Sequence, residues 1–189
     1  YMRETYGVSN EKTALAITIA NREKALLQDL DYENGYSLYV GIPFCPSICL
    51  YCSFGSHPLE RWTKRVDEYL DTLCKELTFI REQMGTRKLT TVYIGGGTPT
   101  TLEPEQLRRL LSHIQETFDF TWVKEYTVEA GRPDSITREK LQVMKEFPVT
   151  RISVNPQTMN QKTLDVIGRK HTVEDLSLIH ISEPTRPLY

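Results

Sequence analysis

The chain has 189 residues, of which 39% are hydrophobic, and its formal net charge is -2 at pH 7. This length suffices to bury a core, and the charge provides no excess of Lys and Arg to attract nucleic acid. No apolar run approaches the roughly 20 residues that a membrane-crossing helix needs, and residues 1–10 lack the basic and apolar regions of a signal peptide. The composition therefore predicts no membrane span and no nucleic-acid partner, and the default location is cytoplasmic.

The first half of the chain predicts a helix, a strand and a second helix. Residues 11–30 are helix-like, and Ser37 to Ile42 is a short β-rich run. From Arg61 to Met84 apolar residues recur at three- and four-residue steps, as one face of a long helix requires. Cys74 lies on that face, so a packing role is favoured over metal ligation.

The second half alternates strands with helices. In order, we expect a strand at 90–94, a helix that begins at Pro104, a strand at 125–130, a helix from Thr137 to Glu146, a strand at 150–157, and a short helix after Asn160 that Gly168 closes. Four strand-then-helix units without hairpin signals predict a parallel sheet with helical crossovers, either an open doubly wound sheet or a barrel. The unusual residues follow the strand ends, where both arrangements build their active sites.

Three cysteines, Cys45, Cys49 and Cys52, lie close together in a chain that has four. Three thiolates bind three irons of a cubane cluster and leave the fourth iron open to another ligand. Zinc is the main alternative, with His57 as a fourth ligand, although the second ligand pair of most structural zinc sites is absent. Disulfides are disfavoured because a domain of this size rarely needs them.

Three further features have both a structural and a functional interpretation. The run from Gly95 to Pro99 lacks the residues of a phosphate-binding loop, so it is either a tight turn or a close approach of backbone to a small ligand. Glu129 ends a β-rich run and would be expensive to bury unpaired, so it is either solvated or bound to a partner. Arg169 is either a solvated charge at a helix end or a ligand for a carboxylate.

The cysteine spacing, with Tyr51 before the last cysteine, resembles the signature of radical S-adenosylmethionine (radical SAM) enzymes. The segments 39–54, 93–102, 129–136 and 151–172 together resemble the oxygen-independent coproporphyrinogen III oxidase group, most of all its HemZ-type coproporphyrinogen dehydrogenase branch. This resemblance implies an α/β fold, a truncated radical SAM partial TIM barrel with parallel strands and helical crossovers. Three regions are expected: a helical lead-in at 1–36, the N-terminal part of the barrel at 37–176, and a non-native tail at 177–189.

The resemblance also implies the cofactors and their ligands. Cys45, Cys49 and Cys52 would bind a four-iron, four-sulfur (4Fe-4S) cluster. The positions that match S-adenosyl-L-methionine (SAM) contacts in relatives are Tyr39, Tyr51, Gly96, Gly97, Thr98, Glu129, Gln157 and Arg169. No catalytic residue is assigned.

In this family a reduced cluster cleaves SAM, and the resulting deoxyadenosyl radical takes hydrogen from a propionate side chain of the substrate. Loss of carbon dioxide then leaves a vinyl group, a step of porphyrin and haem biosynthesis. The resemblance thus implies a porphyrinogen substrate and an electron donor such as flavodoxin or ferredoxin. We expect the chain of 189 residues, taken alone, not to turn over coproporphyrinogen, because relatives carry further barrel strands.

Phe54 leaves alternatives open. Some oxidases carry a further cysteine at this position, whereas phenylalanine is usual in the HemZ-type branch and in the related haem-chaperone branch. A haem-binding delivery protein on the same scaffold is therefore an alternative, and a zinc-stabilised binding module is a third.

Overall fold

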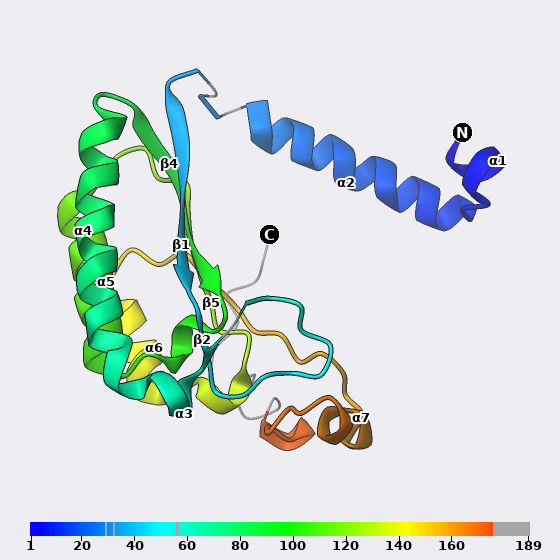
Figure 1. Ribbon diagram of the computed structural model, residues 1–189. Helices are drawn as coiled ribbons and strands as arrows, with labels where there is room; N and C mark the ends of the chain where they lie inside the picture. The colour runs from blue at the N-terminus through cyan, green and yellow to red at the C-terminus, as the bar shows by residue number, and fades with distance from the viewer. Residues whose placement is uncertain (29, 32, 56, 176–189) are drawn as a thin grey trace. The chain divides into compact units, whose positions relative to one another are not determined.

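The computed structural model describes residues 1–28, 30–31, 33–55 and 57–175. The chain divides into two compact units, Tyr1–Gly35 and Tyr36–Tyr189. The first unit contains α1 (Met2–Tyr6) and α2 (Asn10–Gln28), drawn in blue in Figure 1. Helix α2 confirms the helix expected at 11–30, and none of its residues is buried within the structure.

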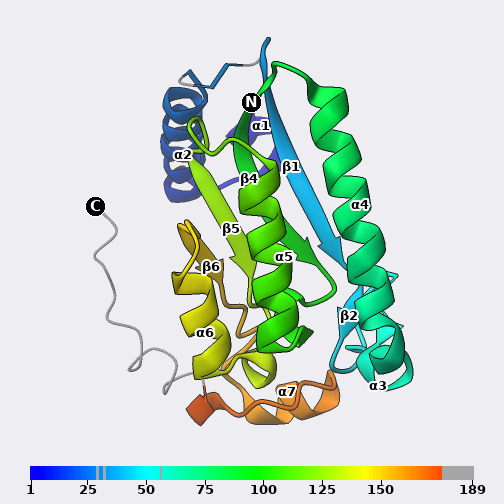
Figure 2. The ribbon, with the colours of Figure 1, turned by 90° about the vertical axis from the view of Figure 1, so that its left-hand side faces the viewer.

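The second unit is built on a four-stranded sheet with the order β1-β4-β5-β6. Its strands are β1 (Gly35–Ile42), β4 (Lys88–Gly96), β5 (Glu125–Glu129) and β6 (Arg151–Ser153). Strand β5 pairs in parallel with both β4 and β6, and the arrows of β1, β4 and β5 point the same way in Figure 2. The predicted parallel sheet is confirmed.

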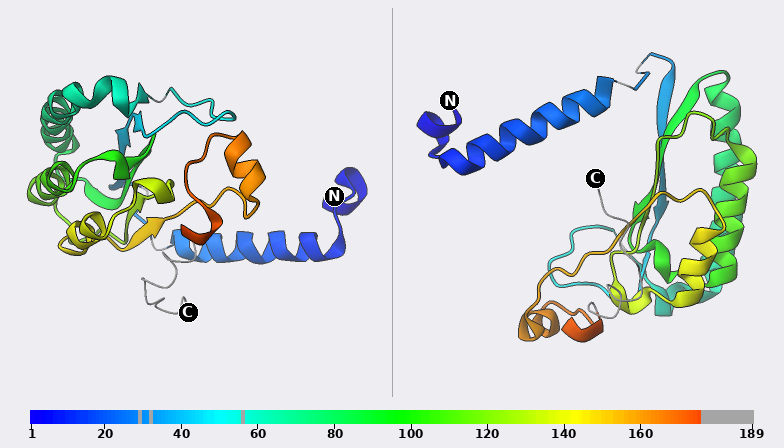
Figure 3. Two further views of the ribbon diagram at one scale, coloured as in Figure 1. Left: turned by 90° about the horizontal axis from the view of Figure 1, so that it is seen from below. Right: turned by 180° about the vertical axis from the view of Figure 1, so that it is seen from behind.

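Three crossover helices cover one face of this sheet: α4 (Val66–Met84), α5 (Pro104–Thr117) and α6 (Arg138–Lys145). They lie on the same side in Figures 1 and 2, and the view along the strands in Figure 3 shows them in an arc. A doubly wound sheet carries helices on both faces and reverses its strand order. Strands in chain order with helices on one side are the arrangement of a barrel segment.

The core lies between the sheet and these helices. On α5, the predicted apolar stripe is fully buried: Leu107, Leu110, Leu111 and Ile114. The sheet contributes alternate residues such as Val92 and Ile94, because successive strand side chains point to opposite faces. Tyr93 and Glu129 have the opposite phase, so they lie on the face that the crossover helices leave uncovered.

The structure differs from the expected elements in three places. The helix expected from Arg61 is interrupted, because a 3-10 turn at Thr63–Arg65 separates α3 (Leu59–Trp62) from α4. The strand expected at 150–157 is shorter, since β6 ends at Ser153. Proline lacks the N–H that a ladder needs, and Pro156 interrupts the rest of that run.

The third difference is a small sheet that the sequence did not predict. Strand β2 (Phe44–Cys45) pairs in parallel with β3 (His57–Pro58), so that Cys45 lies opposite Pro58. The backbone N–H of His57 also donates to the carbonyl of Pro43 over 2.7 Å. The cysteine loop is therefore closed at its base by backbone hydrogen bonds.

The helix starts predicted at Thr137 and Asn160 are confirmed. The Thr137 side chain accepts a hydrogen bond from the Lys140 amide at the start of α6. Asn160 caps α7 (Gln161–Val166) in the same way, and Gly168 follows with φ of 78°, which suits glycine. The tail expected at 177–189 lies outside the described residues.

Candidate functional site

The cysteine loop and α7 lie at the end of the sheet to which the strand arrows point, as Figures 1 and 3 show. The amide of Leu50 donates to the carbonyl of Ile167 over 3.0 Å, and the Ser47 hydroxyl donates to the carbonyl of Gly168. The loop is thereby joined to a segment more than 100 residues further along the chain, since Ser47 and Gly168 are 121 positions apart. This end of the sheet is where parallel α/β folds build their active sites.

The three cysteine sulfurs have different surroundings. Cys45 and Cys49 are each 8% exposed, and Cys52 is half-buried. The Cys45 Sγ lies 3.4 Å from Thr98 Oγ1, and the Cys49 Sγ accepts a hydrogen bond of 3.4 Å from Arg132 Nη1. Among the described residues, no three His, Cys, Asp or Glu side chains converge as a metal site.

The two other candidate ligands lie elsewhere. His57 lies on β3, with its ring centroid 4.8 Å from that of Trp62. Cys74 lies in the middle of α4, which packs against α5 and not at the strand ends. Burial raises the pKa of the Cys74 thiol, which keeps it in the neutral form suited to packing.

The glycine run is packed directly against the start of the cysteine loop. The amides of Gly97 and Thr98 donate to the carbonyls of Ile42 and Phe44 over 2.7 and 2.8 Å. A Cβ added at Gly97 would lie 2.7 Å from the Phe44 oxygen and 2.9 Å from the Ile42 oxygen. The absence of a side chain at Gly97 is therefore required by the approach of the protein's own backbone.

Glu129 is bound within the sheet and not simply solvated. The Tyr93 hydroxyl donates to Glu129 Oε1 over 2.6 Å, and the Tyr93 ring stacks on Tyr39 with centroids 5.8 Å apart. Tyr39 itself is 63% exposed. Two tyrosines and a carboxylate thus line the uncovered face of the sheet near its carboxyl end.

This hydrogen bond gives the first testable prediction. Glu129 raises the pKa of Tyr93 to about 12, from an ordinary value of 10.0. Between those values the unfolded chain releases a proton that the folded chain keeps, so the free energy of unfolding falls as pH rises. The Tyr93→Phe variant lacks this group and should be less stable than the parent at neutral pH.

Urea denaturation of both proteins checks this prediction. The stability gap between parent and Tyr93→Phe should be widest below about pH 10 and should narrow towards pH 12. A gap that is constant over this range would show that the hydrogen bond to Glu129 does not hold the phenol proton.

Arg169 is buried, which excludes the solvated interpretation. It is 7% exposed, and its guanidinium donates to the Gly131 carbonyl over 3.0 Å and to the Tyr51 hydroxyl over 2.9 Å. Its Nε has no partner among the described residues. Gln157 has an exposed side chain and φ of 64°, a strained backbone for a residue other than glycine, and such strain is frequent at functional sites.

Comparisons with known proteins place this arrangement in a family. The model of the Radical SAM superfamily matches residues 39–178, which include the cysteine loop, the glycine run, Glu129 and Arg169. The chain belongs to the radical SAM superfamily. One solved structure, the coproporphyrinogen III oxidase HemN from Escherichia coli, aligns with a TM-score of 0.71 and 29% identity over 82% of this chain. This structural likeness confirms the predicted radical SAM fold.

Two curated relatives are each 40% identical to this chain over the aligned residues. The oxygen-independent coproporphyrinogen-III oxidase-like protein HemZ of Bacillus subtilis aligns over 96% of the chain, and the haem chaperone HemW of the same organism aligns over 74%. The aligned part is 37% of HemZ, 36% of HemW and 36% of the HemN chain. The chain therefore spans little more than a third of the length of these relatives.

The donor set fits the iron–sulfur cluster of a radical SAM protein. Three thiols lie in one loop, and two of them are buried: Cys49 Sγ accepts a hydrogen bond from Arg132, and Cys45 Sγ lies 3.4 Å from the Thr98 hydroxyl, surroundings that suit thiolate ligands. The ring of His57, the fourth ligand that a zinc site would need, packs against Trp62 with centroids 4.8 Å apart, and this gives zinc no support. Phe54 is 73% exposed.

Sequence reasoning missed two buried polar residues at this end of the sheet. Arg132 is 3% exposed and contacts the cysteine loop, whereas the sequence showed only a turn between glycine and proline. His171 is 1% exposed, and neither ring nitrogen has a hydrogen bond of normal geometry with the described residues. Burial lowers the pKa of His171, and the charge of Arg169 acts in the same direction.

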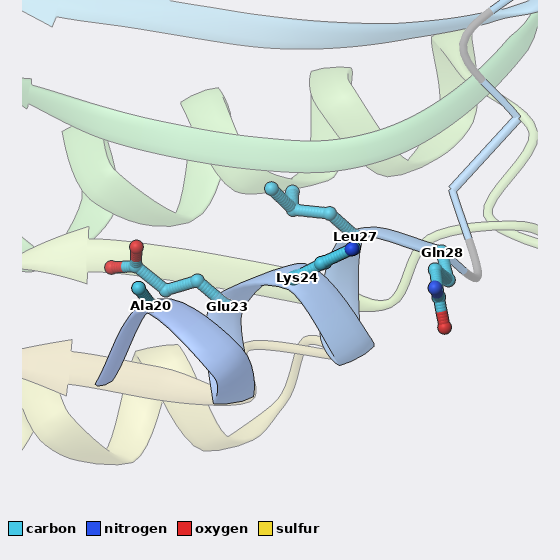
Figure 4. Close-up of a pocket in the computed structure, with 5 residues that line it drawn as sticks. All are labelled: Ala20, Glu23, Lys24, Leu27 and Gln28. Carbon is cyan, nitrogen blue, oxygen red and sulfur yellow. The ribbon is translucent and has the colours of Figure 1, made fainter. Parts of the chain in front are cut away.

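Helix α2 carries a surface hollow of its own. A hollow of about 380 Å³ is lined by Ala20, Glu23, Lys24, Leu27 and Gln28, which Figure 4 shows to come from α2 alone. It contains no residue of the strand ends and is not the candidate site. Among the described residues, no helix is both long and apolar enough to cross a membrane.

Proposed function

We propose that this chain forms the cofactor-binding part of a radical SAM oxidoreductase of the oxygen-independent coproporphyrinogen oxidase type. The observation that carries the proposal is the three-cysteine loop at the carboxyl end of a parallel sheet, joined there by the glycine run and Arg169. A likeness to HemN and HemZ over most of this chain supports it.

Cys45, Cys49 and Cys52 would hold a 4Fe-4S cluster. When bound, the cluster and SAM would supply a one-electron cleavage that yields a carbon radical able to remove hydrogen from an unactivated carbon. The protein's own contribution is to hold the loop, to orient SAM and to keep water out. Burial of Cys45 and Cys49, and the backbone pairing at the loop base, serve the first task.

The residues proposed for SAM surround the loop. The Nε of Arg169 has no hydrogen-bond partner in the described part of the chain, and a guanidinium suits a carboxylate, so Arg169 would bind the methionine end. Glu129 would accept hydrogen bonds from the ribose, while Tyr93 orients its carboxylate. The further proposed contacts are Tyr39, Tyr51, Gly96, Gly97, Thr98 and Gln157.

Calorimetry on the chain after anaerobic cluster reconstitution tests this assignment. Glu129→Gln keeps an acceptor for Tyr93 but removes the charge, and it should weaken SAM binding about tenfold. Glu125→Gln is the matched control, since Glu125 lies at the other end of β5 and pairs with Arg151 over 3.6 Å. Equal SAM affinity in Glu129→Gln and the parent would refute the ribose role.

The substrate class is proposed as a porphyrinogen, with decarboxylation of propionates to vinyls in haem biosynthesis. The support is the coproporphyrinogen III oxidase activity named for HemN. Electrons would come from a donor such as flavodoxin or ferredoxin. Because the chain covers 37% of HemZ, turnover is to be measured on a protein of the relatives' length that carries these residues.

Haem delivery is the second candidate, because a haem chaperone is 40% identical over 141 residues. The two functions are separated by two assays on that longer protein under anaerobic conditions. Conversion of coproporphyrinogen with release of carbon dioxide would support the oxidase. Stoichiometric haem binding without turnover would support the chaperone and overturn the oxidase proposal.

A further inference from the structure

Arg132 is a buried cation with every donor engaged. It lies after β5, just before the 3-10 turn Pro133–Ser135, and it is 3% exposed. A guanidinium has five N–H donors. Two of them bind the carboxylate of Asp134, through Nε over 3.1 Å and Nη2 over 2.9 Å.

The other three donors bind the cysteine loop. Nη1 donates to the Ser47 carbonyl over 3.0 Å and to the Cys49 Sγ over 3.4 Å, and Nη2 donates to the Ser47 hydroxyl over 3.0 Å. A buried charge is costly, and an apolar residue of similar volume often serves stability as well. Stability alone therefore does not explain why an arginine is buried here, and the feature specific to Arg132 is its set of hydrogen bonds to the cysteine loop.

The geometry points to Arg132 as a positioning residue that fixes the cysteine loop and donates a hydrogen bond to the sulfur of Cys49. The part that concerns a cluster rests on the proposed function, whereas the part that concerns the loop does not. Hydrogen bonds to ligand sulfurs set the reduction potential of iron–sulfur clusters, since they stabilise the more negative, reduced state. One edge of the Arg132 guanidinium thus binds Asp134, and Nη1 donates the hydrogen bond to Cys49 that would raise the reduction potential of a cluster.

Arg132→Lys tests both parts, because lysine keeps the charge but has three donors on one nitrogen and cannot span Ser47, Cys49 and Asp134. Arg109→Lys is the matched control, since Arg109 also forms an ion pair, with Asp71, but lies on α5. The double variant Arg132→Met with Asp134→Leu serves if lysine prevents folding, because it leaves no carboxylate stranded. Thermal melts establish that each variant is folded.

Hydrogen–deuterium exchange of the cluster-free chain is the first measurement. Amides of residues 47–52 should exchange about tenfold faster in Arg132→Lys than in the parent, with Arg109→Lys unchanged. Equal loop exchange in Arg132→Lys and the parent would overturn the inference. This result requires no cluster, so it is independent of whether the proposed function holds.

The second measurement is the reduction potential after reconstitution. Where the parent assembles a cluster, Arg132→Lys should have a lower potential and Arg109→Lys the parent value. An unchanged reduction potential in Arg132→Lys would overturn the claim that Arg132 donates a hydrogen bond to a sulfur ligand of the cluster. Failure of the parent itself to assemble a cluster would instead overturn the proposed function together with the cluster part of the inference.

Discussion

Alanine in place of Gly97 is expected to lower the free energy of unfolding by about 2 to 3 kcal/mol. The added Cβ would lie 2.7 Å and 2.9 Å from the carbonyl oxygens of Phe44 and Ile42, which are backbone atoms. Relief requires the glycine run to move away from the end of β1, which breaks the hydrogen bond from the Gly97 amide to Ile42. Urea denaturation of the two proteins measures the difference.

Gly55→Ala is the matched control for this prediction. Gly55 belongs to the cysteine loop, and a Cβ built there meets no atom within 4 Å. Its stability should stay within about 0.5 kcal/mol of the parent, as is usual for exposed positions. Equal stability of Gly97→Ala and Gly55→Ala would contradict the claim that the glycine run packs too closely against the loop backbone to admit a Cβ.

Replacement of Cys45, Cys49 or Cys52 by alanine is expected to abolish cluster binding altogether. Each of these sulfurs is proposed to bind one iron, and a three-cysteine site has no spare thiolate within its loop. Iron and sulfide analysis after anaerobic reconstitution should find only background amounts in each variant. The parent should contain about four irons per chain.

Cys74→Ala provides the control for the cysteine variants. Cys74 lies on α4 among side chains that contact α5, so its loss should leave iron content and visible spectrum at the parent level. Full iron content in Cys49→Ala, or loss of iron in Cys74→Ala, would show that the ligand set is wrongly assigned.

The elements with a long apolar period could be predicted from the sequence. The stripe of α5 is the plainest case, because Leu107, Leu110 and Ile114 are all fully buried in one core with residues of the sheet. Strands β2 and β3 could not be predicted in this way, because each has two residues, which are too few to show a periodic pattern. They exist because backbone groups of the loop base pair with each other, which depends on the path of the loop.

The cysteine ligands could be proposed from spacing, because all three lie in one loop. Arg132 could not, since its acceptors Ser47 and Cys49 are 85 and 83 positions away. An arginine in a turn usually faces water, and local sequence carries no sign of such distant partners. Arg169 was named through resemblance, but its contact with Tyr51, 118 positions away, came only from the structure.

Electron paramagnetic resonance of the reconstituted, reduced chain, with and without SAM, tests the central claim most directly. SAM bound at an open iron should change the spectrum of a reduced four-iron cluster held by three cysteines. We expect a cluster signal that shifts when SAM is added to the parent. A colourless protein with one zinc and no signal, or a cluster signal that SAM leaves unchanged, would contradict the account.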